Sequence, residues 1–378
     1  MIIKTQEFKD ICSTILSAID SNEISTLTET LELKVTDKVL SMSVTNGEYY
    51  ASVNFELGLD EEFHAAVNAN LFLKLIAAVT SENIELSIKD NYVLVKANGT
   101  YKIPMISEMI DNSGKVISLP KIEINNPTVD MKISGSVLES ILNYNSKELL
   151  RGAISRPVQK MFYVDDKGCI TFTTGACVNN FTLAKPIKVL FNSRLVKLFK
   201  LFKNSMVDFT LGYDAVSEEL VQTKVSFKTE KISLTAVTGC NDELLNSVPV
   251  NAIRGRAEGS YDNNVVLNKQ ELLETINRLL LFSAGYGVSK NLKPYSQFVC
   301  NADSVTIYDS NKENKETIKF KNDTKVQDEY IMTLDLADLK LILDSISEEY
   351  VTLSFGNHQA VVLKRPNISN VIPEVKTV

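Results

Sequence analysis

The sequence lacks the features that define several large classes of protein. Its 378 residues include no Trp, and its five Cys form no Cys-x-x-Cys pair. An odd number of widely spaced cysteines suits reduced thiols and excludes a disulfide-rich secreted domain. No apolar run reaches the roughly 20 residues that a membrane-spanning helix needs. The first ten residues are charged and contain no apolar signal core, so we expect a cytoplasmic protein.

Catalytic patterns are missing as well. The two histidines, His64 and His358, have no second His or Cys at metal-ligand spacing. The chain contains no GxSxG, no phosphate-binding GxxxxGKS or GxxxxGKT and no GxGxxG. Glycine pairs in IRGRAEGS (253–260) and SAGYG (283–287) predict loop turns. We therefore expect a protein that is not an enzyme and has neither a cofactor nor a metal site.

Charge is distributed unevenly along the chain, whose net charge is −7. Residues 1–126 hold 10 basic and 18 acidic side chains, residues 127–250 hold 15 and 12, and residues 251–378 hold 15 and 17. Between Asp166 and Asp208 there is no acidic residue but seven Lys or Arg. Local basicity within an acidic chain can attract a polyanion to one surface. The alternative is a solvated face that happens to lack acids.

Three segments of the chain share one pattern. They are VNANLFLKLIAAVTSENIELSI (67–88), FNSRLVKLFKLFKNSMVDFTL (191–211) and LDLADLKLILDSISEEYVTLSF (334–355). In each, an apolar residue and an Asn or Asp precede an amphipathic helix of about three turns with one marker lysine, Lys74, Lys197 or Lys340. A short polar turn then leads into an alternating strand. The marker lysines lie 123 and 143 residues apart, so the repeat has the size of a domain.

An earlier helix is predicted at a similar place in each third. Its apolar face follows the expected strands MIIKT, VDMKI and VVL. Between the two helices lie alternating segments with turn signals, of which LELKV, VLSMSV and YYASVNF are the clearest. The sequence therefore predicts an α+β fold of three tandem domains, 1–126, 127–250 and 251–378, each built from two βαβββ halves.

Three such domains in one chain resemble the bacterial-type DNA polymerase sliding clamp, the beta subunit of the replicative polymerase. The similarity is best in FHAAVNANLFLKLIAAV (63–79), TGCNDELLNSVP (238–249) and EEYVTLSFGNHQAVVLK (348–364). The resemblance implies a non-catalytic homodimer, a head-to-tail ring around double-stranded DNA. Such a ring tethers the replicative DNA polymerase and is loaded by an ATP-dependent clamp loader. Two departures, TTGACVNNF at 173–181 and a C-terminal extension at 365–378, suggest a distant member, encoded by a bacterium or a phage.

The resemblance also implies where DNA is contacted. Basic side chains on the repeated helices, and on the segments after the first helices, would line the hole and attract phosphates without reading bases. They are Lys74, Arg151, Arg156, Lys160, Arg194, Lys197, Lys200, Arg278, Lys290, Lys293 and Lys340. The alternative for each is a solvated side chain on an ordinary surface.

Two further surfaces follow from the resemblance. Tyr101 and Ile103 match an edge strand that packs on the neighbouring subunit, where Leu281 and Phe282 match its partners. The alternative for these four is core packing within one domain. An apolar cleft between the middle and last domains takes short linear motifs from polymerase and loader. Its matching residues are Cys177, Val178, Phe181, Leu244, Leu245, Val361 and Leu363.

Two functions of different classes therefore stay open. One is a processivity ring on DNA, and the other is a scaffold or interaction protein that has the clamp fold but does not encircle DNA. Only a ring is expected to stay on nicked circular DNA and to slide off once that circle is linearised.

Overall fold

The computed structural model describes residues 1–19, 25–58, 61–151, 154–215, 221–283, 293–356 and 360–375. In this part of the chain most of the regular structure is β, in four sheets, and helices are a minority. The chain divides into two compact units, residues 1–139 with 194–241 and residues 140–193 with 242–378. The division passes through the middle third, whose strands belong to two different sheets. The domain boundaries at 126 and 250 stay a prediction.

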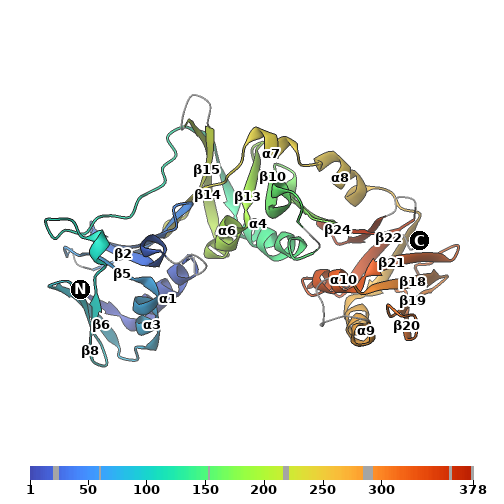
Figure 1. The fold of residues 1–378 in the computed structure, drawn as a ribbon, viewed down its shortest axis with the longest axis horizontal. Helices are drawn as coiled ribbons and strands as arrows, with labels where there is room; N and C mark the ends of the chain where they lie inside the picture. Colours follow the sequence, from blue (N-terminus) through green and yellow to red (C-terminus); the bar gives the residue numbers. More distant parts are fainter. Residues whose placement is uncertain are drawn as a thin grey trace. The chain divides into compact units, whose positions relative to one another are not determined.

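The first unit contains a small sheet and a pair of helices. The strands of this sheet, in order, are β1 (Ile2–Lys4), β6 (Asn83–Lys89), β7 (Tyr92–Lys96) and β8 (Thr100–Pro104). Helices α1 (Thr5–Leu16) and α3 (Ala69–Ala78) lie side by side (Figure 1). Phe8 and Phe72 meet edge to face between them, with ring centroids 6.1 Å apart. The Asn68 side chain accepts a hydrogen bond from the Leu71 backbone N–H and so caps α3.

The large sheet of the first unit joins strands from two thirds of the sequence. Its strands, in order, are β5 (His64–Asn68), β2 (Thr30–Thr36), β3 (Val39–Thr45), β4 (Tyr49–Glu56), β16 (Ile232–Val237), β15 (Val221–Lys228), β14 (Met206–Ala215) and β9 (Pro127–Ser134). The two thirds meet at β4 and β16, where Tyr50 lies opposite Thr235. Because side chains alternate along a strand, one face carries the buried Leu33, Met42 and Phe227, and the other is rich in Ser and Thr. Two short helical turns also belong to this unit: α2 (Thr26–Glu29), between α1 and β2, and η1 (Ser107–Met109), between β8 and β9.

The helices of the middle third are not the continuous α-helices that the sequence predicts. The first runs as α4 (Gly135–Ser140), the π-turn η2 (Ile141–Asn145) and α5 (Ser146–Glu148). The second is α6 (Ser193–Lys197) followed by the 3-10 turn η4 (Leu198–Phe202). The tighter turn aligns Phe199 with Phe202, whose ring centroids lie 5.2 and 5.9 Å from that of Phe227. Packing on this one ring takes the place of the expected three-turn α-helix.

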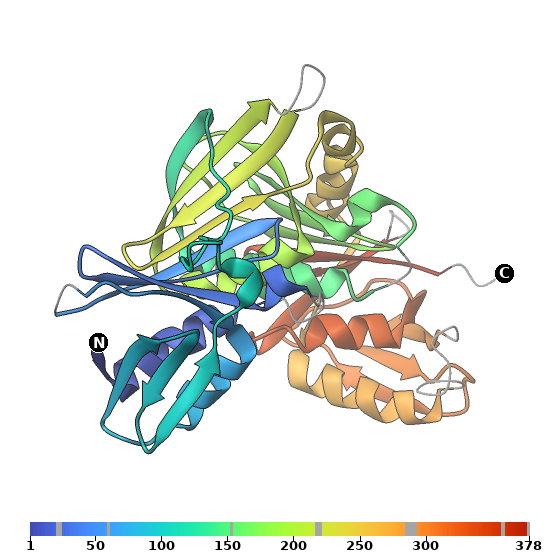
Figure 2. The same ribbon diagram turned by 60° about the vertical axis from the view of Figure 1, so that its left-hand side comes forward.

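The second unit repeats the plan of the first. The strands of its large sheet, in order, are β13 (Lys188–Asn192), β10 (Met161–Asp165), β11 (Gly168–Phe172), β12 (Ala176–Asn180), β24 (Ile368–Pro373), β23 (Ala360–Lys364), β22 (Tyr350–Phe355) and β17 (Asn263–Asn268). Those of its small sheet are β20 (Lys315–Lys319), β19 (Ser304–Tyr308), β18 (Tyr295–Asn301) and β21 (Tyr330–Asp335). Helices α9 (Lys269–Phe282) and α10 (Leu336–Leu343) lie side by side (Figure 2). Three short elements complete the unit: η3 (Pro157–Lys160), α7 (Asp242–Asn246) and α8 (Val250–Glu258).

The C-terminal segment is an integral strand. Residues 368–373 form β24, which pairs with β12 on one side and with β23 on the other. Ile368, Val371 and Ile372 are buried, so the segment joins the middle and last thirds within one sheet. The prediction of an appended extension at 365–378 is therefore wrong for this strand. Residues 376–378 lie outside the described part of the chain.

The glycine pair in IRGRAEGS does not form the predicted loop turn. Gly255 lies inside α8, and Gly259 follows the last residue of that helix. Pro249 precedes α8, and the buried Ile253 and Ala257 recur at the helical spacing of four. These start and spacing signals outweigh the glycine. The glycines of SAGYG lie outside the described residues.

Candidate partner pocket and nucleic-acid interface

A pocket of about 290 Å³ lies on the large sheet of the second unit. It is formed by the β11–β12 turn, by α8 and by the last two strands. Small and apolar side chains make most of its wall, with two threonines and an arginine as polar groups. The lining residues are Phe172, Thr173, Thr174, Gly175, Ala176, Pro249, Ile253, Arg256, Ala360, Val371 and Pro373. The size is close to the lower end of ligand pockets, roughly 300–1,000 Å³, and suits one or two anchoring side chains.

Helix α8 is held over the strands by an ion pair and by packing. It contacts β12, β23 and β24. Arg254 Nη1 and Nη2 donate to the two carboxylate oxygens of Asp165 at 2.8 and 2.7 Å. Burial raises the pKa of the Asp165 carboxyl, but hydrogen bonds from Arg254 and from backbone amides outweigh burial and hold that pKa below its ordinary value. The pair therefore stays ionised at neutral pH and fixes the helix that carries Ile253.

None of the seven predicted cleft residues lines this pocket. Cys177, Val178, Val361 and Leu363 are fully buried in the sheet, so their assignment as contacts for a partner is wrong. Neighbours on the same strands, Ala176 and Ala360, face the pocket instead. Phe181 is half-buried outside the pocket, as are Leu244 and Leu245 on α7. The sequence analysis did not assign Ile253 and Arg256 to a site, because it predicted a loop for their segment. Pro249 and the spacing of four between Ile253 and Ala257 are the signals of a helix there.

Arg151, predicted to contact DNA, is wholly buried. It forms an ion pair with Glu148, and its Nε lies 3.6 Å from Asp338 Oδ2 on α10. Burial raises the pKa of the Glu148 and Asp338 carboxyls, and the charge of Arg151 opposes that rise. A guanidinium enclosed in this way cannot reach a phosphate. The assignment of Arg151 to the DNA interface is therefore wrong.

Six of the other predicted DNA contacts are exposed. They are Lys74 on α3, Lys197 on α6, Lys200 on η4, Arg156 and Lys160 beside and on η3, and Arg278 on α9. Lys340 on α10 is half-buried. The structure brings Lys197 and Lys200 together on consecutive turns, and Arg156 and Lys160 at the two ends of one turn. Lys290 lies outside the described residues.

Three predicted contacts are engaged with acidic side chains. Arg194 Nη1 lies 3.2 Å from Glu48 Oε1. Arg278 donates to Glu316 through Nε and Nη2 at 2.9 and 2.7 Å. Lys293 Nζ lies 3.0 Å from Asp335 Oδ2 and 3.4 Å from Asp338 Oδ1. Because each charge is already compensated, these side chains attract a phosphate less strongly than the exposed lysines do.

The residues predicted at a subunit interface differ in exposure. Leu281 and Phe282, at the end of α9, expose 78% and 55% of their surface. Tyr101, on the edge strand β8, exposes 38%. Ile103 is buried at 2%, so it packs within its own unit and its assignment to the interface is wrong. Leu281 and Phe282 thus leave two neighbouring apolar side chains exposed at the end of α9.

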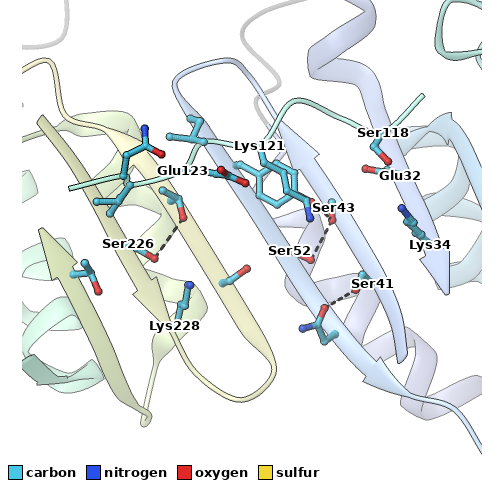
Figure 3. A pocket seen from close by; sticks show the side chains of 18 of the residues that line it. Glu32, Lys34, Ser41, Ser43, Ser52, Ser118, Lys121, Glu123, Ser226 and Lys228 are labelled. Carbon is cyan, nitrogen blue, oxygen red and sulfur yellow. Dashed lines mark hydrogen bonds between the residues drawn. The ribbon is translucent and has the colours of Figure 1, made fainter. Parts of the chain in front are cut away.

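A second, larger cavity of about 910 Å³ lies in the first unit. Its floor is the Ser- and Thr-rich face of the large sheet, and residues 118–127, which we call the connector, cross above it (Figure 3). Ser43 donates to Ser52 at 3.1 Å, and Ser41 donates to Asn54 at 2.8 Å. A floor of this kind offers hydrogen-bonding groups to water.

Two carboxylates hold the ends of the connector. Glu32 Oε2 accepts from the backbone N–H of Leu119 at 3.1 Å, and its Oε1 lies 2.8 Å from His64 Nε2. Asp214 accepts from the backbone N–H groups of Asn125 and Asn126, and from Lys224 Nζ at 2.9 Å. Burial raises the pKa of the Glu32 carboxyl, but hydrogen bonds from His64, Leu119 and Ser118 outweigh it and leave that pKa lowered. Lys224 and the two amides lower the pKa of Asp214.

Sites of other kinds are not found in the described part of the chain. No three His, Cys, Asp or Glu side chains there are grouped so that they could hold a metal ion. No helix among the described residues is long and apolar enough to cross a membrane.

The arrangement of sheets and helices defines the fold class. Over its whole length the chain superimposes on solved sliding clamps, the beta subunits of bacterial DNA polymerase III, and it has the sliding-clamp fold. The α+β clamp fold expected from the sequence is thereby confirmed.

Three solved structures illustrate the similarity. The beta subunit of DNA polymerase from Streptococcus pyogenes matches with a TM-score of 0.79 at 15% identity. The sliding clamp of Pseudomonas aeruginosa, solved with griselimycin bound, gives 0.79 at 12%, and the DNA polymerase III beta subunit of Thermotoga maritima gives 0.76 at 13%. Each match covers 100% of this chain and 99% of the other, which leaves no room for an unmatched extension. No family model and no curated protein matches the sequence.

Proposed function

We propose that this protein is a sliding clamp, a ring that encircles duplex DNA and tethers a replicative DNA polymerase to it. The observation that carries the proposal is the match of the whole chain, end to end, to solved sliding clamps. The role needs no chemical step. The ring works in the cytoplasm of a bacterium or of a phage-infected host.

Duplex DNA is attracted by exposed lysines and arginines and by the half-buried Lys340. Lys74, Lys197 and Lys200 serve in the first unit, and Arg156, Lys160 and Lys340 in the second. Flexible charged side chains neutralise phosphates without reading base edges, so the ring is not fixed at one sequence. Arg194, Arg278 and Lys293 contribute less, because acidic neighbours already compensate them.

The ring is closed by two copies of the chain arranged head to tail. Leu281 and Phe282 of one copy cover Tyr101 and the free edge of β8 in the other. The supporting observations are the exposure of these three side chains and the position of β8 at the edge of its sheet. Burying them in a dimer removes apolar surface from water.

The polymerase and the ATP-dependent clamp loader are held at the 290 Å³ pocket of the second unit. A short linear segment places an apolar side chain against Ile253, Val371 and Pro373, while Arg256 meets its polar flank. What supports this assignment is the combination of a small apolar cavity with a few polar groups, the pattern of ligand pockets in general.

A topological experiment tests the proposal. The protein is loaded on nicked circular DNA by a cognate loader and ATP, and half of the sample is then linearised. Retention on the circle and loss from the linear DNA are expected. Equal retention on both would favour the scaffold that does not encircle DNA. Light scattering at micromolar concentration should give twice the chain mass of 42.1 kDa, and a mass of one chain would contradict the dimer.

A further inference from the structure

A buried guanidinium lies directly behind the wall of the pocket. A Cβ atom added to Gly175 would lie 2.8 Å from Arg151 Nη2, 2.9 Å from its Nη1 and 2.4 Å from the Val371 carbonyl oxygen. Gly175 and Val371 both line the pocket, whereas Arg151 does not. Only a glycine fits between this strand and the guanidinium. Arg151 therefore supports the pocket from the side that a bound segment does not touch.

The same guanidinium is linked to a second residue of the wall. Thr173, which lines the pocket, donates through Oγ1 to Glu148 Oε1 at 2.8 Å. Glu148 is in turn ion-paired with Arg151. The β11–β12 turn is thus tied to Arg151 at two points, by the contact at Gly175 and by the hydrogen bond of Thr173.

On its other side Arg151 reaches the last third of the chain. Its Nε lies 3.6 Å from Asp338 Oδ2, and helix α10, which carries Asp338, packs against α5. Lys293 pairs with Asp338 and with Asp335, whose carboxylate accepts from the Ala337 and Asp338 backbone N–H groups at the start of α10. One guanidinium therefore joins a wall of the pocket to the N-terminus of α10.

Burying these charged groups costs free energy that a purely structural role would not require. Among the described residues Arg151 Nε and Nη2 have no hydrogen-bond partner, and Arg151 exposes none of its surface. Apolar residues of similar volume often replace buried ion pairs with no loss of stability. A planar guanidinium, however, can hold two carboxylates from separate segments in a fixed geometry, which an apolar side chain cannot do.

We propose that Arg151 is a positioning residue for the partner pocket, which fixes the β11–β12 turn relative to α10 and thereby sets the affinity for the bound segment. The inference rests on the proposed function of the pocket. Without Arg151, the carboxylates of Glu148 and Asp338 lose their shared partner and the turn loses its rear support. The wall formed by Thr173 to Ala176 then shifts, although no residue that touches the bound segment has changed.

The test needs a probe whose binding depends on the pocket. A displayed library of random peptides is selected against the wild-type protein, and binders are kept only if Ile253→Asp removes their binding. The best one, labelled with a fluorophore, is titrated against the wild type, Arg151→Met, Arg151→Lys and Asp338→Asn. Ile307→Val, a substitution in the buried core of β19, controls for a general loss of stability.

Arg151→Met is expected to weaken peptide binding about tenfold, even if its melting temperature equals that of the wild type. Arg151→Lys, which keeps the charge but not the fork, should lose less, and Asp338→Asn several-fold. Because Arg151 and Asp338 act through one contact, their combined loss should be smaller than the sum of the two losses. Ile307→Val should bind like the wild type.

Two results would overturn the inference, and they are distinguishable. If Ile253→Asp removes binding but Arg151→Met and Asp338→Asn leave it unchanged, the pocket is a binding site and Arg151 does not position it. If selection yields no peptide that depends on Ile253, the pocket has no such function and the role of Arg151 fails with it. Should Arg151→Met not fold, Arg151→Lys and Asp338→Asn decide the question.

Discussion

The two large sheets are built alike but are covered differently. Each has four strands from the middle third and four from a flanking third, and the thirds meet at β4–β16 in the first unit and at β12–β24 in the second. The first sheet is crossed by the connector above a polar cavity of about 910 Å³. The second is covered by α8 beside a pocket of about 290 Å³. Several of the hydroxyls that line the larger cavity already pair with neighbouring side chains, so a ligand gains little from them by displacing water.

The comparison teaches that volume alone does not identify a binding site. A short side chain such as Ser leaves space under the connector, and its hydroxyl group offers hydrogen bonds to water in that space. The smaller pocket has apolar walls held by an ion pair and by a buried network, so it can bury an anchoring side chain. The following predictions test whether the two covers, the connector on the first sheet and α8 on the second, differ in this way.

The largest effect is expected for Ile253→Asp in the pocket. A carboxylate there cannot be desolvated by an apolar anchor, so partner binding should fall on the order of 50-fold, about 2.3 kcal/mol. The measurement is polymerase processivity on the loaded clamp, because the selected peptide is chosen for its dependence on Ile253. Ser233→Asp, in the wall of the polar cavity, is the matched control and should leave processivity unchanged. An equal loss in both variants would remove the distinction between the two covers.

Glycine substitutions in the pocket wall and beneath the connector should reduce the stability of the protein by different amounts. A Cβ at Gly175 meets the Val371 carbonyl oxygen at 2.4 Å, so Gly175→Ala should destabilise the protein by about 1–3 kcal/mol. A Cβ at Gly212 would lie 2.2 Å from Ile124 Cγ2, the end of a side chain that can turn away, and 2.8 Å from the Asn126 carbonyl oxygen, a wider approach than the 2.4 Å at Gly175. Gly212→Ala should therefore cost less. Chemical denaturation measures both, and a greater cost at Gly212 would show that the connector is the more rigid cover.

DNA retention should distinguish lysines of equal exposure. The joint change Lys197→Ala and Lys200→Ala should weaken retention about tenfold and reduce the slope of log affinity against log salt by up to about 2. The joint change Lys34→Ala and Lys228→Ala, on the polar cavity, removes the same charge and should leave retention unchanged. A salt titration of retention on nicked circles measures both. Equal losses would mean that overall charge, rather than these helices, attracts DNA.

The smallest effect concerns pH. The pKa values of Glu32 and Asp214 are lowered in the folded protein, so their contribution is present above the unfolded values, about 4.3 and 3.9. This contribution to stability is lost as the pH falls through the pKa values that the two carboxyls have in the folded protein. The connector should therefore become sensitive to an acid protease only below about pH 4. The pKa values of Glu148 and Asp338 are raised, so their contribution changes in the opposite direction, being lost as pH rises through the folded values. Cleavage of the connector already at pH 6 would contradict this assignment.

Much of the fold could be predicted because it depends on local periodicity. The alternation of Leu33, Val35 and their neighbours predicted strands, and the spacing of Phe72 and Ile76 predicted α3. Periodicity reports which face of an element is apolar, but not what covers that face. Helix α8 and strand β24 were missed because a glycine and a divergent ending concealed the same kinds of pattern.

The candidate site was harder to predict than the fold. Residue type places an arginine at the surface, yet Arg151 is enclosed by Glu148 and Asp338, which are distant from each other in sequence. Cys177 and Ala176 are adjacent, and strand alternation places one in the core and the other in the pocket. A shift of one residue reverses such an assignment.

By itself the sequence determined most of the helices and strands, their repeated pattern and the uneven charge, because these depend on neighbours within a few residues. Only the tertiary structure decided which thirds share a sheet, that β24 lies between β12 and β23, and which side chains line the pocket. The physical reason is that strand order and burial depend on contacts between segments far apart in the chain. The same contacts took Arg151 away from the predicted DNA surface and placed it behind the pocket.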